Sequence, residues 1–152
     1  MIVEVTEDNI FEAAKIHSES WKESHKAFCS KEFVETHNIE RQLEYLRNEI
    51  NNGKDVYMLI DNIPVGIVSV KDSLIENLYV LPEEQSKGYG TELLKFAINK
   101  CKDIPSLWIL NYNEKAYKLY YKHGFMKTGK ENRLSDELSE IEMKLLRKGA
   151  IK

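Results

Sequence analysis

Residues 76–101 join a short apolar segment to a helical pattern through a polar loop with two glycines one residue apart, Gly88 and Gly90. The segment "ENLYVL" is rich in residues that favour strands. After the loop, apolar residues recur at the spacing of an amphipathic helix that begins at Gly88 and ends at Cys101. A strand that feeds directly into a helix N-terminus restricts the chain to a mixed α/β architecture.

Helical and strand patterns alternate through the rest of the chain. An amphipathic helix follows the first strand, with Thr6 or Asp8 as its predicted cap, and a second amphipathic stretch runs from Phe33 to Ile50 and ends at Gly53. "DVYMLI" and "VGIVSVK" predict an antiparallel hairpin with its turn at "DNIP". The predicted strands cover residues 2–5, 55–60, 65–71, 73–81, 106–110, 125–135 and 139–146.

Length and composition indicate one cytoplasmic domain that spans residues 1–152. The apolar fraction is 42%, but no apolar run approaches the roughly 18 residues that cross a membrane, so no membrane partner is expected. A net charge of −3, evenly spread, does not favour a nucleic-acid partner. Cys29, Cys101 and the four histidines show no spacing typical of metal ligands, so no metal site is predicted.

The glycine loop is suited to a phosphate. A helix N-terminus carries unpaired N–H groups and a partial positive charge, and glycines allow the main chain to approach a ligand closely or to take a positive φ. Lys87 adds a cation beside them. The loop lacks both the P-loop pattern and the third glycine of a dinucleotide fingerprint. A turn that uses glycine for its geometry alone stays an alternative.

A second motif follows in "LWILNYNEKAYKLYYKHGF", which joins a strand to a helix. Asn113 is a favourable N-cap and Gly124 a favourable C′ residue for that helix. Tyr120 lies on the apolar face, where an ordinary core aromatic would give the same pattern.

Together, Q-x-x-G-x-G-T after "LYVLPEE" and N-x-x-A-x-x-x-Y-x-x-x-G-F resemble the GNAT superfamily of N-acetyltransferases. The hairpin "MLIDNIPVGIVSV" and the segment "IHSESWKES" also look like the central hairpin and first helix of that family. The resemblance implies an α+β single domain: a twisted, mixed but mostly antiparallel sheet, flanked by helices, whose two central strands splay apart. It also implies transfer of an acetyl group from acetyl-CoA to a primary amine of a small molecule or peptide.

The resemblance carries roles to individual residues. The pyrophosphate loop falls on Gln85, Ser86, Lys87, Gly88, Tyr89, Gly90 and Thr91. The main chain of Leu78, Tyr79 and Val80 would bind the pantetheine arm, as an extended ligand completes a sheet edge. Asn113 matches the asparagine that contacts the cofactor, and Tyr120 matches the tyrosine near the thioester sulfur, where it would act as the acid.

The general base and the acceptor pocket are less well marked. Strand alternation is expected to place Glu76 on one face with Leu78 and Val80, as a base or as a solvated strand-end carboxylate. "LWILN" lacks the glutamate that some family members carry there. Trp21, His25 and Phe28 fall in the region that lines the acceptor pocket in the family, although core packing accounts equally well for Trp21.

Two further alternatives stay open at this point. A non-catalytic acyl-CoA-binding or sensing domain would keep the glycine loop but would not need Tyr120. Two copies of the chain could also pair as a homodimer through the closing strands, at residues 125–135 and 139–146.

Overall fold

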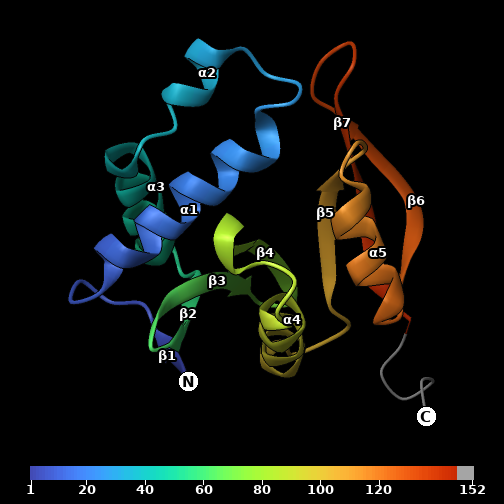
Figure 1. Ribbon diagram of the computed structural model, residues 1–152. Helices are drawn as coiled ribbons and strands as arrows, with labels where there is room; N and C mark the ends of the chain where they lie inside the picture. The colour runs from blue at the N-terminus through green and yellow to red at the C-terminus, as the bar shows by residue number, and fades with distance from the viewer. Residues whose placement is uncertain (147–152) are drawn as a thin grey trace.

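The computed structural model describes residues 1–146, whose strands form a seven-stranded sheet in the order β1-β2-β3-β4-β5-β7-β6 (Figure 1). The strands are β1 (Ile2–Glu4), β2 (Asp55–Asp61), β3 (Ile63–Lys71), β4 (Leu74–Val80), β5 (Ser106–Leu110), β6 (Phe125–Arg133) and β7 (Ser139–Leu145). The helices are α1 (Ile10–His25), α2 (Lys31–Glu35), α3 (Ile39–Asn51), the 3₁₀ turn η1 (Pro82–Glu84), α4 (Tyr89–Lys100) and α5 (Glu114–Lys122).

The sheet is divided at its centre. All neighbouring strands pair antiparallel except β4 and β5, which run parallel and pair at a single position, Leu74 with Ser106. Beyond that pair the strands diverge, and β5 continues to Leu110 on β7 alone. Figure 1 shows β5, β6, β7 and α5 on one side of the molecule and β1 to β3, α1 and α3 on the other. The predicted mixed sheet with splayed central strands is confirmed.

Two apolar clusters hold the helices on the sheet. One joins α1 and α3 to one face of β2 and β3, with Ala13, Ile16 and Leu46 fully buried. The other joins α4 and α5 to the opposite face and to β5, β6 and β7 around Leu93 and Phe125. Burial of a large apolar side chain such as Leu46, Leu93 or Phe125 contributes about 1.5–3 kcal/mol, so the two clusters fix both layers around the divided sheet.

Two local predictions are wrong. The stretch from Phe33 to Ile50 is not one helix, because Asn38 takes extended backbone (φ −78°, ψ 176°) and its side chain accepts a hydrogen bond from the N–H of Arg41, which starts α3 afresh. The predicted cap of α1 by Thr6 or Asp8 is also absent. Asn9 is the N-cap residue, and its side chain accepts from the N–H of Thr6 instead of from the helix.

A β-bulge in β4 reverses one prediction about side-chain direction. Between the pairs Ser69 with Glu76 and Ile67 with Tyr79, β4 holds one residue more than β3, and Asn77 has a positive φ of 54°. Leu78 then packs on the cluster with α4 and α5, whereas Glu76 pairs with Lys54 beside α3. Simple alternation predicts that Glu76 shares a face with Leu78 and Val80. That prediction is wrong, because the bulge places Glu76 on the other face.

A buried histidine makes stability depend on pH. His17 of α1 is 4% exposed, stacks on Tyr79 at a ring-centroid distance of 4.9 Å, and has an Nδ1 atom without a hydrogen-bond partner in the described chain. Burial lowers the pKa of His17 to about 3, and the positive charges of His37, Lys54 and His25 act in the same direction.

We predict that the free energy of unfolding falls as the pH is lowered from about 6.5 toward 4. The unfolded chain binds a proton at this histidine below about pH 6.5, whereas the folded chain does so only near pH 3, so His17 alone costs up to about 1.4 kcal/mol per pH unit. His17→Phe keeps an aromatic ring against Tyr79 and should flatten this slope in urea unfolding at successive pH values. An unchanged slope would show that His17 does not stay neutral in the fold.

Candidate active site

A cavity of about 990 Å³ opens where β4 and β5 diverge. Its walls come from the end of β4, the loop into α4, the first turn of α4, one face of α5 with the segment before it, the C-terminal part of α1 and the turn between β6 and β7. Segments that lie far apart in the sequence therefore meet in one concave space. Such a space, partly apolar with a few converging polar groups, is typical of a small-molecule site.

The end of β4 presents main-chain groups to this cavity. The N–H of Leu81 donates to the carbonyl of Val65 in β3, so the alternating main-chain groups of Leu78 and Val80 face away from β3, toward the space that β5 leaves open. The carbonyl of Val80 accepts bonds of 3.1 Å from Ser20 Oγ and from Gln85 Nε2, and all three residues line the cavity. The N–H groups of Leu78 and Val80 thus form a donor edge without a neighbouring strand.

The glycine loop has the predicted geometry at one glycine and not at the other. Gly88 is the N-cap of α4 with φ 90°, a left-handed conformation that strains other residues. Gly90 lies within the helix without a positive φ, and a Cβ there would touch Leu119 at an ordinary 3.6 Å. Ser86 has φ 67°, which the sequence did not indicate. No side chain caps α4, so its first N–H groups point freely into the cavity.

Three side-chain contacts hold the loop in place. Gln85 donates to Val80 and accepts a 2.6 Å hydrogen bond from Lys115 Nζ of α5. Tyr89 donates a 2.6 Å hydrogen bond to Asp61 of β2, and this bond raises the pKa of Tyr89 to about 12. The loop is therefore fastened to both halves of the divided sheet before any ligand binds.

The cation on the cavity wall is Lys115 and not Lys87. Lys87 pairs with Glu84 at 2.9 Å and does not line the cavity, whereas Lys115 does. Sequence reasoning missed Lys115. Its position between Asn113 and Ala116, inside the N-x-x-A motif, is the signal that could have identified it, because the first turn of α5 adjoins the loop.

Asn113 and Tyr120 reach the cavity from α5. The side chain of Asn113 accepts a hydrogen bond from the N–H of Ala116, which confirms the predicted N-cap, and Gly124 follows the helix with φ 96°. Tyr120 is 8% exposed and still lines the cavity. Burial raises the pKa of Tyr120 well above its usual value, so the phenol is protonated at any ordinary pH and is available as a hydrogen-bond donor.

Two other candidate groups lie off the cavity wall. Glu76 does not line the cavity and forms a 2.7 Å ion pair with Lys54 instead. The ring of Trp21 is stacked between the rings of His25 and His37, at centroid distances of 3.8 Å and 3.4 Å. Neither Trp21 nor His25 lines the cavity, so both lie behind its wall.

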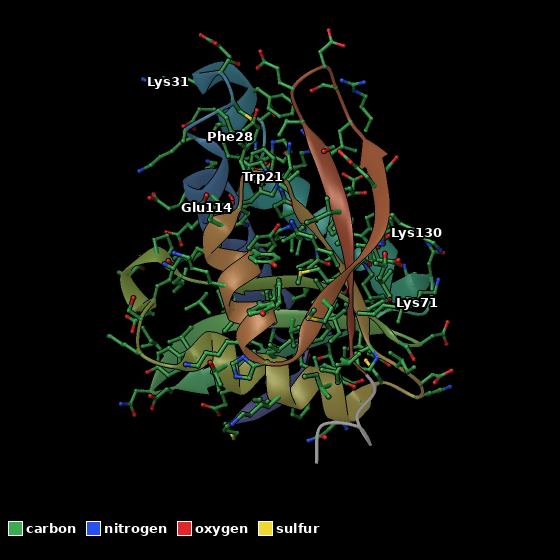
Figure 2. The ribbon with its side chains drawn as sticks, turned by 90° about the vertical axis from the view of Figure 1, so that its right-hand side faces the viewer. Trp21, Phe28, Lys31, Lys71, Glu114 and Lys130 are labelled. Carbon is green, nitrogen blue, oxygen red and sulfur yellow. The ribbon has the colours of Figure 1, made fainter. Side chains whose placement is uncertain are left out.

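Phe28 is the one of the three predicted acceptor residues that lines the cavity. The ring of Phe28 contacts the ring of His25 on α1 at a centroid distance of 5.5 Å and the ring of Tyr112, which also lines the cavity, at 5.9 Å. Figure 2 labels Phe28, which lies in the segment that follows α1, together with Trp21 of α1. The stack behind Phe28 therefore supports the wall without forming it.

The family model described as "Acetyltransferase (GNAT) domain" matches residues 13–147. The chain belongs to the GNAT acetyltransferase family. It is therefore an acetyltransferase.

Solved structures share the fold over nearly the whole chain. PaiA N-acetyltransferase from Thermoplasma acidophilum, in complex with coenzyme A, is 22% identical, with 95% of this chain and 98% of that chain covered at a TM-score of 0.70. YncA from Salmonella typhimurium, with its cofactor acetyl-CoA, is 20% identical, with 95% and 92% covered at a TM-score of 0.70. Ribosomal-protein-alanine N-acetyltransferase from Brucella melitensis is 18% identical, with 95% and 98% covered at a TM-score of 0.66. Among curated proteins, none matches the chain.

Within residues 1–146, the helices are too short or too polar for any of them to cross a membrane.

We predict that Gly88→Val weakens acetyl-CoA binding by about tenfold or more, measured by calorimetry. A β-branched residue at φ 90° costs about 1–3 kcal/mol of backbone strain, and its side chain would stand where the loop meets the ligand. Gly53→Val is the matched control, because Gly53 has φ 98° and open space around it but lies away from the cavity. Equal losses of affinity in both variants, or none in either, would contradict the loop assignment.

Proposed function

We propose that this acetyltransferase transfers the acetyl group of acetyl-CoA to a primary amine of a small molecule or peptide by direct attack of the amine on the thioester. The observation that carries the proposal is that one cavity joins the donor edge of Leu78 and Val80, the open N-terminus of α4 and the protonated phenol of Tyr120. Each group matches one part of an acyl-CoA and its reaction.

The cofactor follows from the position of these groups. The pyrophosphate binds the unpaired N–H groups at the start of α4, where the helix dipole favours negative charge. Lys115 and Asn113, on the neighbouring first turn of α5, contact the cofactor from the other half of the sheet. The pantetheine arm lies along Leu78 to Val80 and forms the hydrogen bonds that β5 would form in a continuous sheet.

In the reaction, the lone pair of a neutral amine forms a bond to the thioester carbon, and the carbonyl oxygen becomes an oxyanion. A main-chain N–H on the donor edge of β4 stabilises that oxyanion. The carbon–sulfur bond then breaks, and the thiolate receives a hydrogen bond and a proton from Tyr120. Proton transfer from a phenol with a pKa of about 10 or more to a thiolate whose thiol has a pKa of about 8.5 is unfavourable. The short distance between the phenol and the sulfur has to compensate for this difference.

The proton that the amine loses passes to water in this proposal, and water returns a proton to the phenolate of Tyr120, so the products are the acetylated amine and the free thiol. Glu76 is held by Lys54 on the opposite face of β4, and it does not line the cavity. Glu76 is therefore assigned no role as the base, although sequence reasoning selected it for that role.

The acceptor end of the cavity is acidic and partly aromatic. Glu23 of α1 and Glu137 of the β6–β7 turn line it together with Phe28 and Tyr112. Glu23 also pairs with Lys26 at 2.9 Å, but that pair is exposed and contributes little, so Glu23 is available to a ligand. Carboxylates favour a cation, whereas the reacting amine has to be neutral, so they suit an acceptor with a second positive charge.

The direct test is release of free thiol from acetyl-CoA by the purified protein across diamines, amino acids, aminoglycosides and peptides with free amines. Amine-dependent release, with the acetylated amine identified by mass spectrometry, would support the proposal. Tight acetyl-CoA binding with no release across the panel would contradict it and would favour the non-catalytic acyl-CoA-binding alternative.

We predict that Tyr120→Phe lowers kcat by about tenfold or more and leaves the affinity for acetyl-CoA nearly unchanged, because the ring keeps its packing and only the proton donor is lost. Stopped-flow turnover and calorimetry give the two quantities. Tyr121→Phe is the matched control, since Tyr121 is 54% exposed and does not line the cavity. If Tyr120→Phe turns over at the normal rate, another group protonates the thiolate.

We also predict that a linear alkyl diamine is acetylated about tenfold more efficiently than the alkyl monoamine of the same length, by kcat/KM, and that the corresponding amino acid is the poorest of the three. Glu137→Gln should reduce the preference for the diamine, whereas Glu12→Gln, at a half-buried position away from the cavity, should keep it. Equal efficiency for the three acceptors would exclude recognition of a second charge.

A further inference from the structure

A buried lysine lies directly beneath the bulge of β4. Lys54 precedes β2, its side chain is 3% exposed, and its ammonium group contacts Glu49 at 2.5 Å and Glu76 at 2.7 Å. The same nitrogen lies 3.4 Å from Asn77 Oδ1 and 3.5 Å from the hydroxyl of Tyr45. Burial alone would lower the pKa of Lys54, but the two carboxylates outweigh it and raise the pKa to about 12, so the group stays charged.

The residues around Lys54 belong to two groups. Tyr45 and Glu49 are on α3, and their contacts fasten the helix to the start of β2. Glu76 and Asn77 are on β4 at the bulge, where Asn77 also accepts a 3.1 Å hydrogen bond from Ser69 of β3. One ammonium group therefore holds the two residues that immediately precede Leu78.

The conformation at Asn77 decides where the donor edge points. Asn77 lies at the bulge and has a φ of 54°. Because β4 holds one extra residue there, the main-chain groups of Leu78 and Val80 are turned toward the cavity. A one-residue slip of β4 would exchange the two faces of the strand and turn these groups away. Left-handed backbone at a non-glycine residue is unfavourable, so contacts from the surroundings have to maintain it.

A charged group in this position is not needed for stability alone. Replacing a buried ion pair with apolar residues is often neutral or stabilising, whereas an ammonium group fixes several oxygen atoms at defined distances. Lys54 does not line the cavity, so it does not touch the reacting atoms. Its contacts to Glu76 and Asn77 connect it to the cavity through the bulge.

We propose that Lys54 is a positioning residue for acetyl transfer: through Glu76 and Asn77 it holds the bulge of β4 in the conformation that directs the N–H groups of Leu78 and Val80 at the thioester. The proposal rests on the proposed function above. It gives Glu76 a role in orienting the donor edge.

The test compares Lys54→Met with Glu49→Gln. Both variants break the ion pair between Lys54 and α3, but only Lys54→Met also removes the contacts to the bulge. We expect Lys54→Met to lower kcat by about tenfold or more, as loss of a well-placed oxyanion donor does, and to shift the amide resonance of Val80 in the unliganded protein. Glu49→Gln should change kcat less than about twofold, even if both variants lose thermal stability.

Asn77→Gly provides a second route to the same measurement if Lys54→Met does not fold. Glycine tolerates the positive φ but offers no side chain to Lys54 or Ser69, so the bulge loses its fixed geometry and kcat should fall in the same way. Equal kcat losses in Lys54→Met and Glu49→Gln, or normal kcat in Asn77→Gly, would overturn the positioning role. Absence of acetyl transfer by the unmodified protein would instead overturn the proposed function itself.

Discussion

The structure depends on the incomplete pairing of β4 with β5. The two strands share one register pair, Leu74 with Ser106, and then separate, so each leaves main-chain N–H and C=O groups without a strand partner. Unpaired main-chain groups are costly when they are buried away from water. An extended ligand with amide groups of its own satisfies them, and the pantetheine arm of acetyl-CoA is such a ligand. In the function that we propose, the gap in the sheet is therefore the cofactor site.

The surroundings of this gap are built to keep it open and polarised. Gln85 connects the glycine loop to β4 and to Lys115 of α5, and Tyr89 connects it to Asp61 of β2, so the loop does not have to be ordered by the cofactor. The open N-terminus of α4 and Lys115 provide positive charge at the end of the cavity that adjoins the glycine loop. Glu23 and Glu137 provide negative charge at the acceptor end. In the proposed reaction, the donor and the acceptor would therefore meet opposite charges in one cavity.

Local signals in the sequence were sufficient for the parts of the site that depend on the backbone of one segment. Gly88 marks the start of α4 and Asn113 caps α5, because a left-handed turn and a helix cap each depend on residue types at fixed offsets. The bulge at Asn77 could not be predicted in this way, since it is set by Lys54, Ser69 and the register of β3.

The other differences between the predicted and the observed site also come from contacts between residues that are distant in the sequence. Glu76 was selected by strand alternation, and the bulge moved it to the other face. Trp21 and His25 were selected for their place in the chain, but stacking with His37 holds them behind the cavity wall. Lys115 was overlooked because its contact with Gln85 joins residues 30 positions apart. Pairing of two copies through β6 and β7 stays a prediction, and β6 is the exposed edge of the sheet on that side.

Amide hydrogen exchange with and without coenzyme A tests the central claim most directly, that the space between β4 and β5 is the cofactor site. The account predicts strong protection of the amides of Leu78 and Val80 and of the first turn of α4 when the cofactor is bound, with little change in β1 or at the outer edge of β6. Binding that protects the first turn of α4 but leaves Leu78 and Val80 exchanging at their unliganded rates would contradict it, because the cofactor would then not complete the sheet.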